Sequence, residues 1–265
     1  MRIVDTHAHV STNWFEPLET LGYHMHAAGV ARAILTQVLG QTDNAYVQRC
    51  RREDPQRFGT IVVVDADQPD VGERLRQLVG DGAAGVRLRP RFRSPFGDGL
   101  AVWRAAAELG ITVSAPGASE DFLSDEFAAV LTAFPDLPVV IEHLGGRNAP
   151  DATDALRAQR HAVFGLARFP NAYLKIHGLG EFATRTPDRT APEQFERPIP
   201  TYLGEALSAF GPQRLLWGSD FPLVCAREGY ANALQLCWSE FNACSETERA
   251  AIFGGVADRL FPPSR

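Results

Sequence analysis

Short runs of apolar and β-branched residues recur along the chain, and segments with helical patterns separate them. Eight of these runs are candidates for strands: Ile3–Val10, Arg32–Val38, Gly59–Asp65, Ala84–Arg89, Ile111–Ala115, Leu137–His143, Ala172–His177 and Leu215–Asp220. Most of them are almost continuously hydrophobic, which is typical of parallel strands covered on both faces. The pattern therefore predicts a parallel sheet built from strand–helix units.

The intervening segments carry the signals of helices. Leu100–Leu109 has apolar residues at helical spacing and is followed by Gly110, a residue that often ends a helix. Gln235–Phe253 is predicted to form a final helix or helix pair, in which Ser245 and Glu248 have the spacing of a capping box. The predicted strands therefore alternate with helices along the whole chain.

Alternating strands and helices can form either an open doubly wound sheet or a closed barrel. Eight units in 265 residues match the (β/α)8 TIM barrel, which takes ~250 residues. The dinucleotide-binding alternative lacks its Gly-x-Gly-x-x-Gly motif after the first strand. No linker of Pro, Ser or Gly divides the chain. We therefore predict one α/β domain over residues 1–265, an eight-stranded parallel barrel with its chemistry at the carboxyl ends of the strands.

Composition narrows the class of partner. With 45% hydrophobic and 22% charged residues, the chain resembles an ordinary soluble globule. Its formal net charge of −6 and the lack of an apolar run of ~18 residues argue against nucleic-acid and membrane partners. The four cysteines show no Cys-x-x-Cys spacing, and no secretory apolar region is evident near the amino end. We expect a cytoplasmic protein that acts on a small molecule.

Two histidines end the first predicted strand. His7 and His9 are two residues apart, so their imidazoles share a face and can meet one ion at the barrel mouth. Neutral imidazole is a ligand for divalent transition metals, and a carboxylate completes a mixed shell. A His-x-His pair also occurs by chance, as two polar residues at a strand end. The spacing alone therefore leaves a metal role open.

An aspartate closes the last predicted strand. Asp220 follows the sequence Leu-Leu-Trp-Gly-Ser, and the first and eighth strands become neighbours when a barrel closes. We therefore expect its carboxylate beside His7 and His9, where it can bind an ion and accept a proton from water. The alternative is an aspartate that only caps the following turn.

His143 ends the sixth predicted strand, after three β-branched residues and a glutamate and before two glycines. This position predicts a site residue, which is either a third metal ligand or a group that orients the water or the substrate carbonyl. A buried core histidine is the alternative. We expect Glu142, the neighbour of His143, to face the outer helices because side chains alternate along a strand.

Arginines indicate the charge of the substrate. Arg87 and Arg89 share one face at the end of the fourth strand, and a guanidinium matches the geometry of a carboxylate. Arg227 lies on the loop beyond Asp220, and His177 ends the seventh strand near the mouth. These residues are candidates for binding an anionic substrate. The alternatives are a solvated basic loop and, for His177, a polar residue packed under a loop.

Three motifs together resemble the amidohydrolase superfamily: His7-Ala-His9, Glu142-His143-Leu-Gly-Gly and Trp217-Gly-Ser-Asp220-Phe-Pro. More narrowly, they are similar to the amidohydrolase-related group of sugar lactonases, pyrone-dicarboxylate and muconolactone hydrolases, and nonoxidative decarboxylases. The resemblance runs from the first strand to the last. It implies that the first-strand histidines and the last-strand aspartate hold one divalent ion, zinc or manganese, and that the aspartate is the base toward water.

The fifth predicted strand departs from that resemblance. Relatives that depend on a metal often supply a histidine or a carboxylated lysine there, whereas this strand carries Ser114 and no such ligand. We therefore expect no binuclear site. A metal-free mechanism, as in some lactonases of the group, stays open. Glu142 also stands where the group often has aspartate.

These observations predict a hydrolase that adds water to the carbonyl of a lactone or related ester, with a small, carboxylate-bearing substrate. Asp220 would take the proton from water, His143 would stabilise the oxyanion, and Arg87 would bind the substrate carboxylate. One alternative is a nonoxidative decarboxylase of an aromatic or muconate-type acid on the same scaffold. The other is a catalytically inactive barrel used for binding. A homo-oligomer is compatible with either function.

Overall fold

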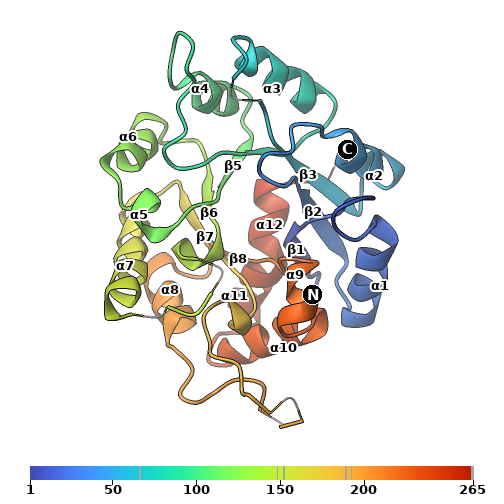
Figure 1. The fold of residues 1–265 in the computed structure, drawn as a ribbon, viewed down its shortest axis with the longest axis vertical. Helices are drawn as coiled ribbons and strands as arrows, with labels where there is room; N and C mark the ends of the chain where they lie inside the picture. Colours follow the sequence, from blue (N-terminus) through green and yellow to red (C-terminus); the bar gives the residue numbers. More distant parts are fainter. Residues whose placement is uncertain (66, 148, 152, 189, 192, 264–265) are drawn as a thin grey trace.

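Eight parallel strands lie at the centre of the molecule in chain order, from β1 to β8 (Figure 1). The computed structural model describes residues 1–65, 67–147, 149–151, 153–188, 190–191 and 193–263. The strands are β1 (Val4–Ala8), β2 (Arg32–Thr36), β3 (Phe58–Val62), β4 (Gly85–Arg87), β5 (Thr112–Ala115), β6 (Val139–Ile141), β7 (Ala172–Ile176) and β8 (Leu215–Trp217).

Backbone contacts between the first and last strands close the sheet. Ala8 and Phe221 form a parallel bridge, and the N–H of Asp220 donates to the His7 carbonyl oxygen at 2.8 Å. The N–H of His9 donates to the Phe221 carbonyl oxygen at 2.7 Å. The predicted (β/α)8 TIM barrel is therefore confirmed, and its seam brings Asp220 beside the first-strand histidines.

The observed strands are shorter than the hydrophobic runs that predicted them. β6 ends at Ile141 and β8 ends at Trp217, so that His143 and Asp220 lie beyond the strand ladder. The chain must turn outward after each strand to reach the next helix. The last apolar and polar residues of each run therefore belong to the loops at the mouth of the barrel.

Helices surround the barrel (Figure 1). They are α1 (Leu18–Ala28), α2 (Ala45–Glu53), α3 (Val71–Gly80), α4 (Ala101–Glu108), α5 (Ser119–Phe122), α6 (Asp125–Ala133), α7 (Asp154–Phe164), α8 (Tyr202–Phe210), α9 (Leu223–Arg227), α10 (Tyr230–Glu240), α11 (Glu246–Ala250) and α12 (Val256–Leu260), with the short turns η1 (His143–Gly145), η2 (Gly165–Arg168), η3 (Leu179–Glu181) and η4 (Ala251–Gly255). The predicted capping box begins α11, where the N–H of Ser245 donates to the Glu248 carboxylate at 2.8 Å. None of the helices in the described part of the chain is long and apolar enough to cross a membrane.

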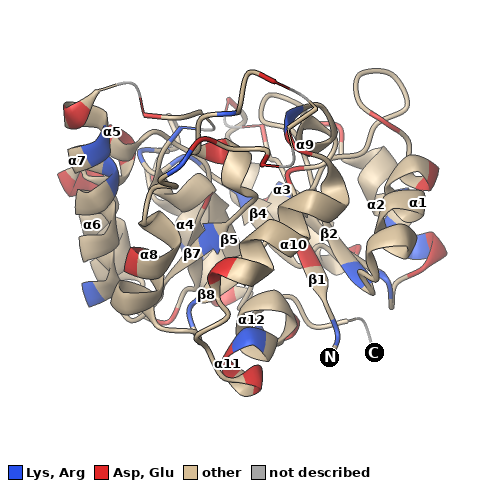
Figure 2. Ribbon diagram, turned by 90° about the horizontal axis from the view of Figure 1, so that it is seen from below, with Lys and Arg blue, Asp and Glu red and all other residues tan. Residues whose placement is uncertain are grey.

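The interior of the barrel is apolar at the amino ends of the strands. Residues of five strands pack there against α12 and against Phe261, which follows it. The strand residues are Val4, Ile34, Ile61, Val140 and Leu216, and those of α12 are Val256 and Leu260. Figure 2 shows α11, α12 and both termini at this end, and α9 at the opposite end. The Thr112 hydroxyl donates to the Leu260 carbonyl oxygen at 3.0 Å and helps to attach α12 to the barrel. The amino end is thus closed, and polar residues occupy the other end.

Candidate active site

Imidazoles and a carboxylate gather where β1 and β8 end. His7, His9 and Asp220 are all buried. The Nε2 atoms of the two histidines lie 3.1 Å apart, and each lies 3.8 Å from Asp220 Oδ1. A register shift between Asp5 and Ala8 in the pairing of β1 with β2 accompanies this arrangement. The structure thus brings together the three residues that the strand ends suggested.

The donor set and spacing of these residues fit a metal ion. Ligands of a tetrahedral ion at about 2.1 Å lie roughly 3.4 Å apart, and the observed separations of 3.1 and 3.8 Å bracket that value. His9 Nδ1 lies 2.6 Å from the Thr36 carbonyl oxygen, to which it donates, so the Nε2 lone pair remains for a ligand. Burial lowers the pKa of His7 well below its ordinary value and the pKa of His9 to about 3. Both rings are therefore neutral, as metal binding requires.

Asp220 is a desolvated carboxylate held by an arginine. Burial raises the pKa of Asp220 to about 6, although the charges of His143 and Arg227 oppose the shift. Arg227 donates through Nη1 to Asp220 Oδ2 at 3.1 Å and lies 3.2 Å from Glu181 Oε1. Its Nε donates to Glu228 Oε1 at 3.3 Å. The predicted substrate-binding residue Arg227 thus contacts three carboxylates of the chain itself.

His143 is oriented by a glutamate from the loop after β7. Its Nδ1 lies 2.9 and 3.0 Å from the two carboxylate oxygens of Glu181, so it donates there and leaves Nε2 for the site. Burial alone would lower the pKa of His143, but the charge of Glu181 raises it overall. Its side chain is 14% exposed, more than those of His7 or Asp220. A charged, partly accessible imidazole can donate a hydrogen bond to a developing oxyanion.

Two of these residues have a strained backbone. Asp220 has a φ of 62° and His143 a φ of 53°, in the left-handed region that non-glycine residues seldom adopt. Such conformations cost about 1–3 kcal/mol each and concentrate at functional sites. In both cases the turn follows directly on a buried strand and directs the side chain into the barrel mouth.

Glu142 lies inside the barrel, so the expectation that it faces the outer helices is wrong. Val140 packs in the barrel interior, and alternation carries the side chain two residues later to the same side. The Glu142 carboxylate accepts hydrogen bonds from Arg87 Nε at 3.1 Å, Arg87 Nη2 at 2.7 Å and Ser114 Oγ at 2.6 Å. Burial opposes the ionisation of Glu142, but Arg87 holds its pKa below the usual value. His143 also points inward because of its left-handed turn.

The guanidinium of Arg87, which is predicted to bind a substrate carboxylate, therefore pairs with Glu142 inside the protein. It is only 8% exposed, and its Nη1 donates to the Gln37 carbonyl oxygen at 3.1 Å. Arg89 is exposed, and within the described part of the chain no hydrogen bond or ion pair engages its side chain. The two arginines line a cavity of about 300 Å³ together with Leu39, Val63, Phe92 and neighbouring residues.

Lys175 of β7 packs directly behind the histidine pair. Its Nζ lies 3.0 Å from the Thr6 carbonyl oxygen, 3.2 Å from His7 Nδ1 and 3.3 Å from Ser114 Oγ. Burial lowers the pKa of Lys175 to about 8, so the ammonium still dominates at neutral pH. Metal-binding histidines usually donate their second nitrogen to an acceptor. His9 follows this rule, whereas His7 faces the lysine.

His177 is fully enclosed next to the other histidines. Its ring stacks on His143 with centroids 4.4 Å apart and lies edge-on to His7 at 5.0 Å. Burial lowers its pKa well below the ordinary value. Neither ring nitrogen has a hydrogen-bond partner among the described residues. Leaving a buried imidazole without a hydrogen bond is costly.

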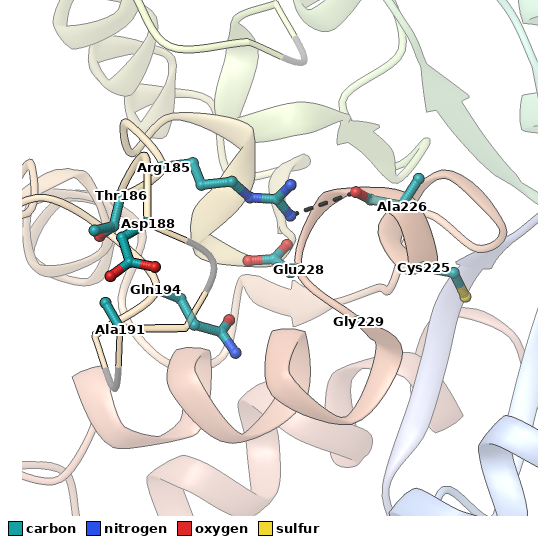
Figure 3. Close-up of a pocket in the computed structure, with 9 residues that line it drawn as sticks. All are labelled: Arg185, Thr186, Asp188, Ala191, Gln194, Cys225, Ala226, Glu228 and Gly229. Carbon is teal, nitrogen blue, oxygen red and sulfur yellow. Dashed lines mark hydrogen bonds between the residues drawn. The ribbon is translucent and has the colours of Figure 1, made fainter.

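A separate cavity of about 300 Å³ is lined by Ala226 and Glu228, the sequence neighbours of Arg227, and by residues of the loop after β7 (Figure 3). Figure 3 shows Arg185 reaching across it toward the Ala226 carbonyl oxygen, at 3.4 Å, with Glu228 beneath. The Glu228 carboxylate also accepts from the Gly180 N–H at 2.7 Å. None of the predicted site residues lines this cavity, and Arg227 contacts both Glu228 and Asp220.

Sequence reasoning missed the roles of Glu181, Glu142 and Lys175. Lys175 lies on β7 two residues before His177 and shares its strand face, and this spacing could have indicated that Lys175 points toward the site. Alternation counted from His143 places Glu142 on the outer face, whereas alternation counted from Val140 in β6 places it inside the barrel. Glu181 lies in a turn beyond β7, where no periodicity marks it.

The fold and the site together define a TIM-barrel protein with a histidine and carboxylate centre at its mouth. The family model described as Amidohydrolase matches residues 4–262, and the chain belongs to this family. It is 37% identical to an L-fucono-1,5-lactonase from Burkholderia multivorans, over 89% of this chain and 82% of that protein.

Solved structures share the fold. An amidohydrolase from Burkholderia multivorans with bound zinc has a TM-score of 0.80 and 23% identity, with 100% of both chains covered. A probable 2-pyrone-4,6-dicarboxylic acid hydrolase from Acinetobacter baumannii with citric acid bound has a TM-score of 0.72 and 19% identity, with 98% of this chain and 99% of that chain covered. Both structures therefore match the fold of this chain over nearly its whole length.

Proposed function

We propose that this protein hydrolyses the ester carbonyl of a lactone. The observation that carries the proposal is the position of Asp220, a desolvated carboxylate 3.8 Å from the Nε2 atoms of both His7 and His9. A carboxylate with a pKa raised by burial is a better base than one in water. The similarity to a curated L-fucono-1,5-lactonase supports the same reaction class.

The chain's own residues supply most of the parts of this reaction. Asp220 accepts a proton from the attacking water, and Arg227 holds its Oδ2 so that Oδ1 faces the histidines. His143, whose protonated form the Glu181 carboxylate favours, donates in that form to the carbonyl oxygen as negative charge develops there. Protonated Asp220 then returns its proton to the ring oxygen that leaves. The balance is one water added and one ester bond broken.

His7, His9 and Asp220 are the residues that would hold a divalent ion, zinc or manganese. Such an ion, when bound, would polarise the carbonyl and lower the pKa of a water molecule toward ~7. Without an ion, His7 could still donate a hydrogen bond from Nε2 to the carbonyl oxygen, because its Nδ1 accepts from the Lys175 ammonium. Lys175 beside His7 Nδ1 opposes a cation, while the Glu142 carboxylate, 3.9 Å from the same nitrogen, favours one.

The internal pairing of the arginines bears on the charge of the substrate. Arg87 is engaged by Glu142, and Arg227 by Asp220 and Glu181. Arg89 remains as the guanidinium able to meet a substrate carboxylate at the mouth. We therefore favour a substrate lactone that carries at most one carboxylate over a lactone that carries two.

The experiment is a panel of sugar, muconate and pyrone lactones assayed with a pH indicator, since each ester hydrolysis releases one acid. Asp220→Asn and His7→Ala are expected to lower kcat by about 10²-fold or more, with melting temperatures near that of the wild type. Arg89→Met, at the exposed mouth, is the matched control for neutral lactones. Release of carbon dioxide without acid formation would identify a decarboxylase instead, and full activity in both site variants would refute the mechanism.

A further inference from the structure

A ladder of aromatic rings leads outward from His9. The Phe15 ring stacks on the His9 imidazole with centroids 5.7 Å and planes 24° apart. Trp14 stacks on Phe15 with centroids 5.9 Å and planes 18° apart, and it is 68% exposed. A large indole surface is usually buried in a monomeric protein. In this protein only the Phe15 ring separates the exposed indole of Trp14 from the imidazole of His9 in the stack.

The loop that presents this ladder is held by its own hydrogen bonds. The N–H of Ser11 donates to the Glu16 carbonyl oxygen at 2.9 Å. The N–H groups of Asn13 and Trp14 both donate to Ser11 Oγ, each at 3.2 Å. The backbone that carries the indole is therefore held before any ligand arrives, which reduces the entropic cost of binding.

The ladder forms one wall of a cavity of about 310 Å³. Residues that follow β2 also line it, among them Gln37 and Gln41 from the loop and Tyr46 from α2. Gln37 directly follows Thr36, the residue whose carbonyl oxygen binds His9 Nδ1. Both stretches of chain that line the cavity therefore adjoin or include residues that contact His9.

The lining of this cavity is polar but carries no cation. Asp43 is its charged residue, and the side chains that can bond a ligand are neutral amides and hydroxyls. In the described part of the chain, the Gln41 side chain and Asn13 Nδ2 make no hydrogen bond. The volume is that of a small-molecule site. An aromatic face suits the C–H face of a ring, and amides suit its hydroxyl groups.

We propose that this cavity binds the hydroxyl-bearing part of the substrate, with Trp14 as the stacking platform and Gln41 as a hydrogen-bonding partner. The proposal rests on the lactonase function proposed above. It goes further because it assigns substrate specificity to the loops after β1 and β2. It also requires a neutral, polyhydroxylated lactone.

The test compares two kinds of lactone with the same six-membered ring. L-fucono-1,5-lactone and D-glucono-1,5-lactone carry hydroxyl groups, whereas δ-valerolactone carries none. Trp14→Ala and Gln41→Ala are expected to raise KM for the hydroxylated lactones several-fold to about tenfold. The two substitutions should leave kcat for the hydroxylated lactones nearly unchanged. They should also leave kcat and KM for δ-valerolactone nearly unchanged. Trp14→Phe should restore most of the affinity, because it retains a stacking face.

Tyr23→Ala is the matched control, since Tyr23 is 71% exposed on α1 outside the cavity. Unchanged KM for the hydroxylated lactones in both cavity variants, with an active wild type, would overturn the proposal while the lactonase function stands. A change of oligomeric state in Trp14→Ala, measured by light scattering, with KM unaltered, would overturn it in favour of a subunit interface. A wild type that hydrolyses no lactone would overturn the function and this inference together.

Discussion

Replacing Arg87 by methionine is expected to destabilise the fold. Glu142 is fully buried and would lose the two hydrogen bonds at 3.1 and 2.7 Å that Arg87 donates, keeping the one from Ser114 at 2.6 Å. Breaking a buried pair by removing one partner costs about 3–5 kcal/mol. Since 1 kcal/mol corresponds to roughly 2–4 °C in a chain of this size, Tm should fall on the order of 10 °C.

A double-mutant cycle separates the pairing from a general loss of packing. Glu142→Gln alone leaves the Arg87 cation without its carboxylate and should also be destabilising. The double variant Arg87→Met/Glu142→Gln removes both charges, and it should be more stable than the sum of the single effects predicts by about 1–3 kcal/mol. Arg89→Met serves as the exposed control, with a change within about 0.5 kcal/mol. The wild type and all four variants are compared by thermal and urea unfolding followed by circular dichroism.

The pH dependence gives a second check on the same pair. Arg87 holds the folded-state pKa of Glu142 below its usual 4.5, so the carboxylate contributes stability above that value and loses it as the pH falls. The difference in Tm between wild type and Arg87→Met should therefore be largest above about pH 5 and shrink toward pH 3. An unchanged Tm in Arg87→Met, together with a raised KM for a carboxylate-bearing lactone, would refute the internal pairing.

Three further predictions concern the site. Glu181→Gln removes the charge that raises the pKa of His143, so the alkaline limb of the pH–rate profile should move to lower pH; an unmoved limb would contradict the assigned contact. His177→Phe keeps the buried ring without its unpartnered nitrogens, so Tm should change by only a few degrees while kcat/KM falls more than about tenfold; full activity would exclude a role for those nitrogens. Elemental analysis of protein never exposed to chelator should find about one zinc or manganese ion per chain, and a fully active, metal-free protein would support the mechanism that uses the histidines alone.

The barrel could be predicted from the sequence because its evidence is local. Each strand is a short apolar run, and each run is covered on both faces, so hydrophobicity alone marks it. The same logic located His7, His9 and Asp220, because a polar residue that ends such a run must lie at the mouth. The capping box of Ser245 and Glu248 likewise marks the start of α11, and the structure retains it.

The arrangement of charges inside the mouth could not be predicted in the same way. Alternation assigns Glu142 and His143 to opposite faces, yet both point inward because His143 adopts a left-handed φ of 53° after the strand ends. That turn has no periodic signature. The pairing of Arg87 with Glu142 joins residues 55 positions apart in sequence, so the expectation of a free guanidinium had no local evidence against it.

The seam between β1 and β8 explains why the distances in the site depend on the whole fold. Asp5 accepts hydrogen bonds from the His7 N–H at 3.0 Å, the Ser219 N–H at 2.8 Å and Oγ at 2.6 Å, and the Tyr230 hydroxyl at 2.8 Å. It therefore joins the strand that carries His7 to the loop that carries Asp220, although these residues lie more than 200 positions apart. Burial raises the pKa of Asp5, and its four donors oppose that shift. The spacing between His7 and Asp220 is thus fixed only when the barrel closes, and closure is a property of the complete set of eight strands.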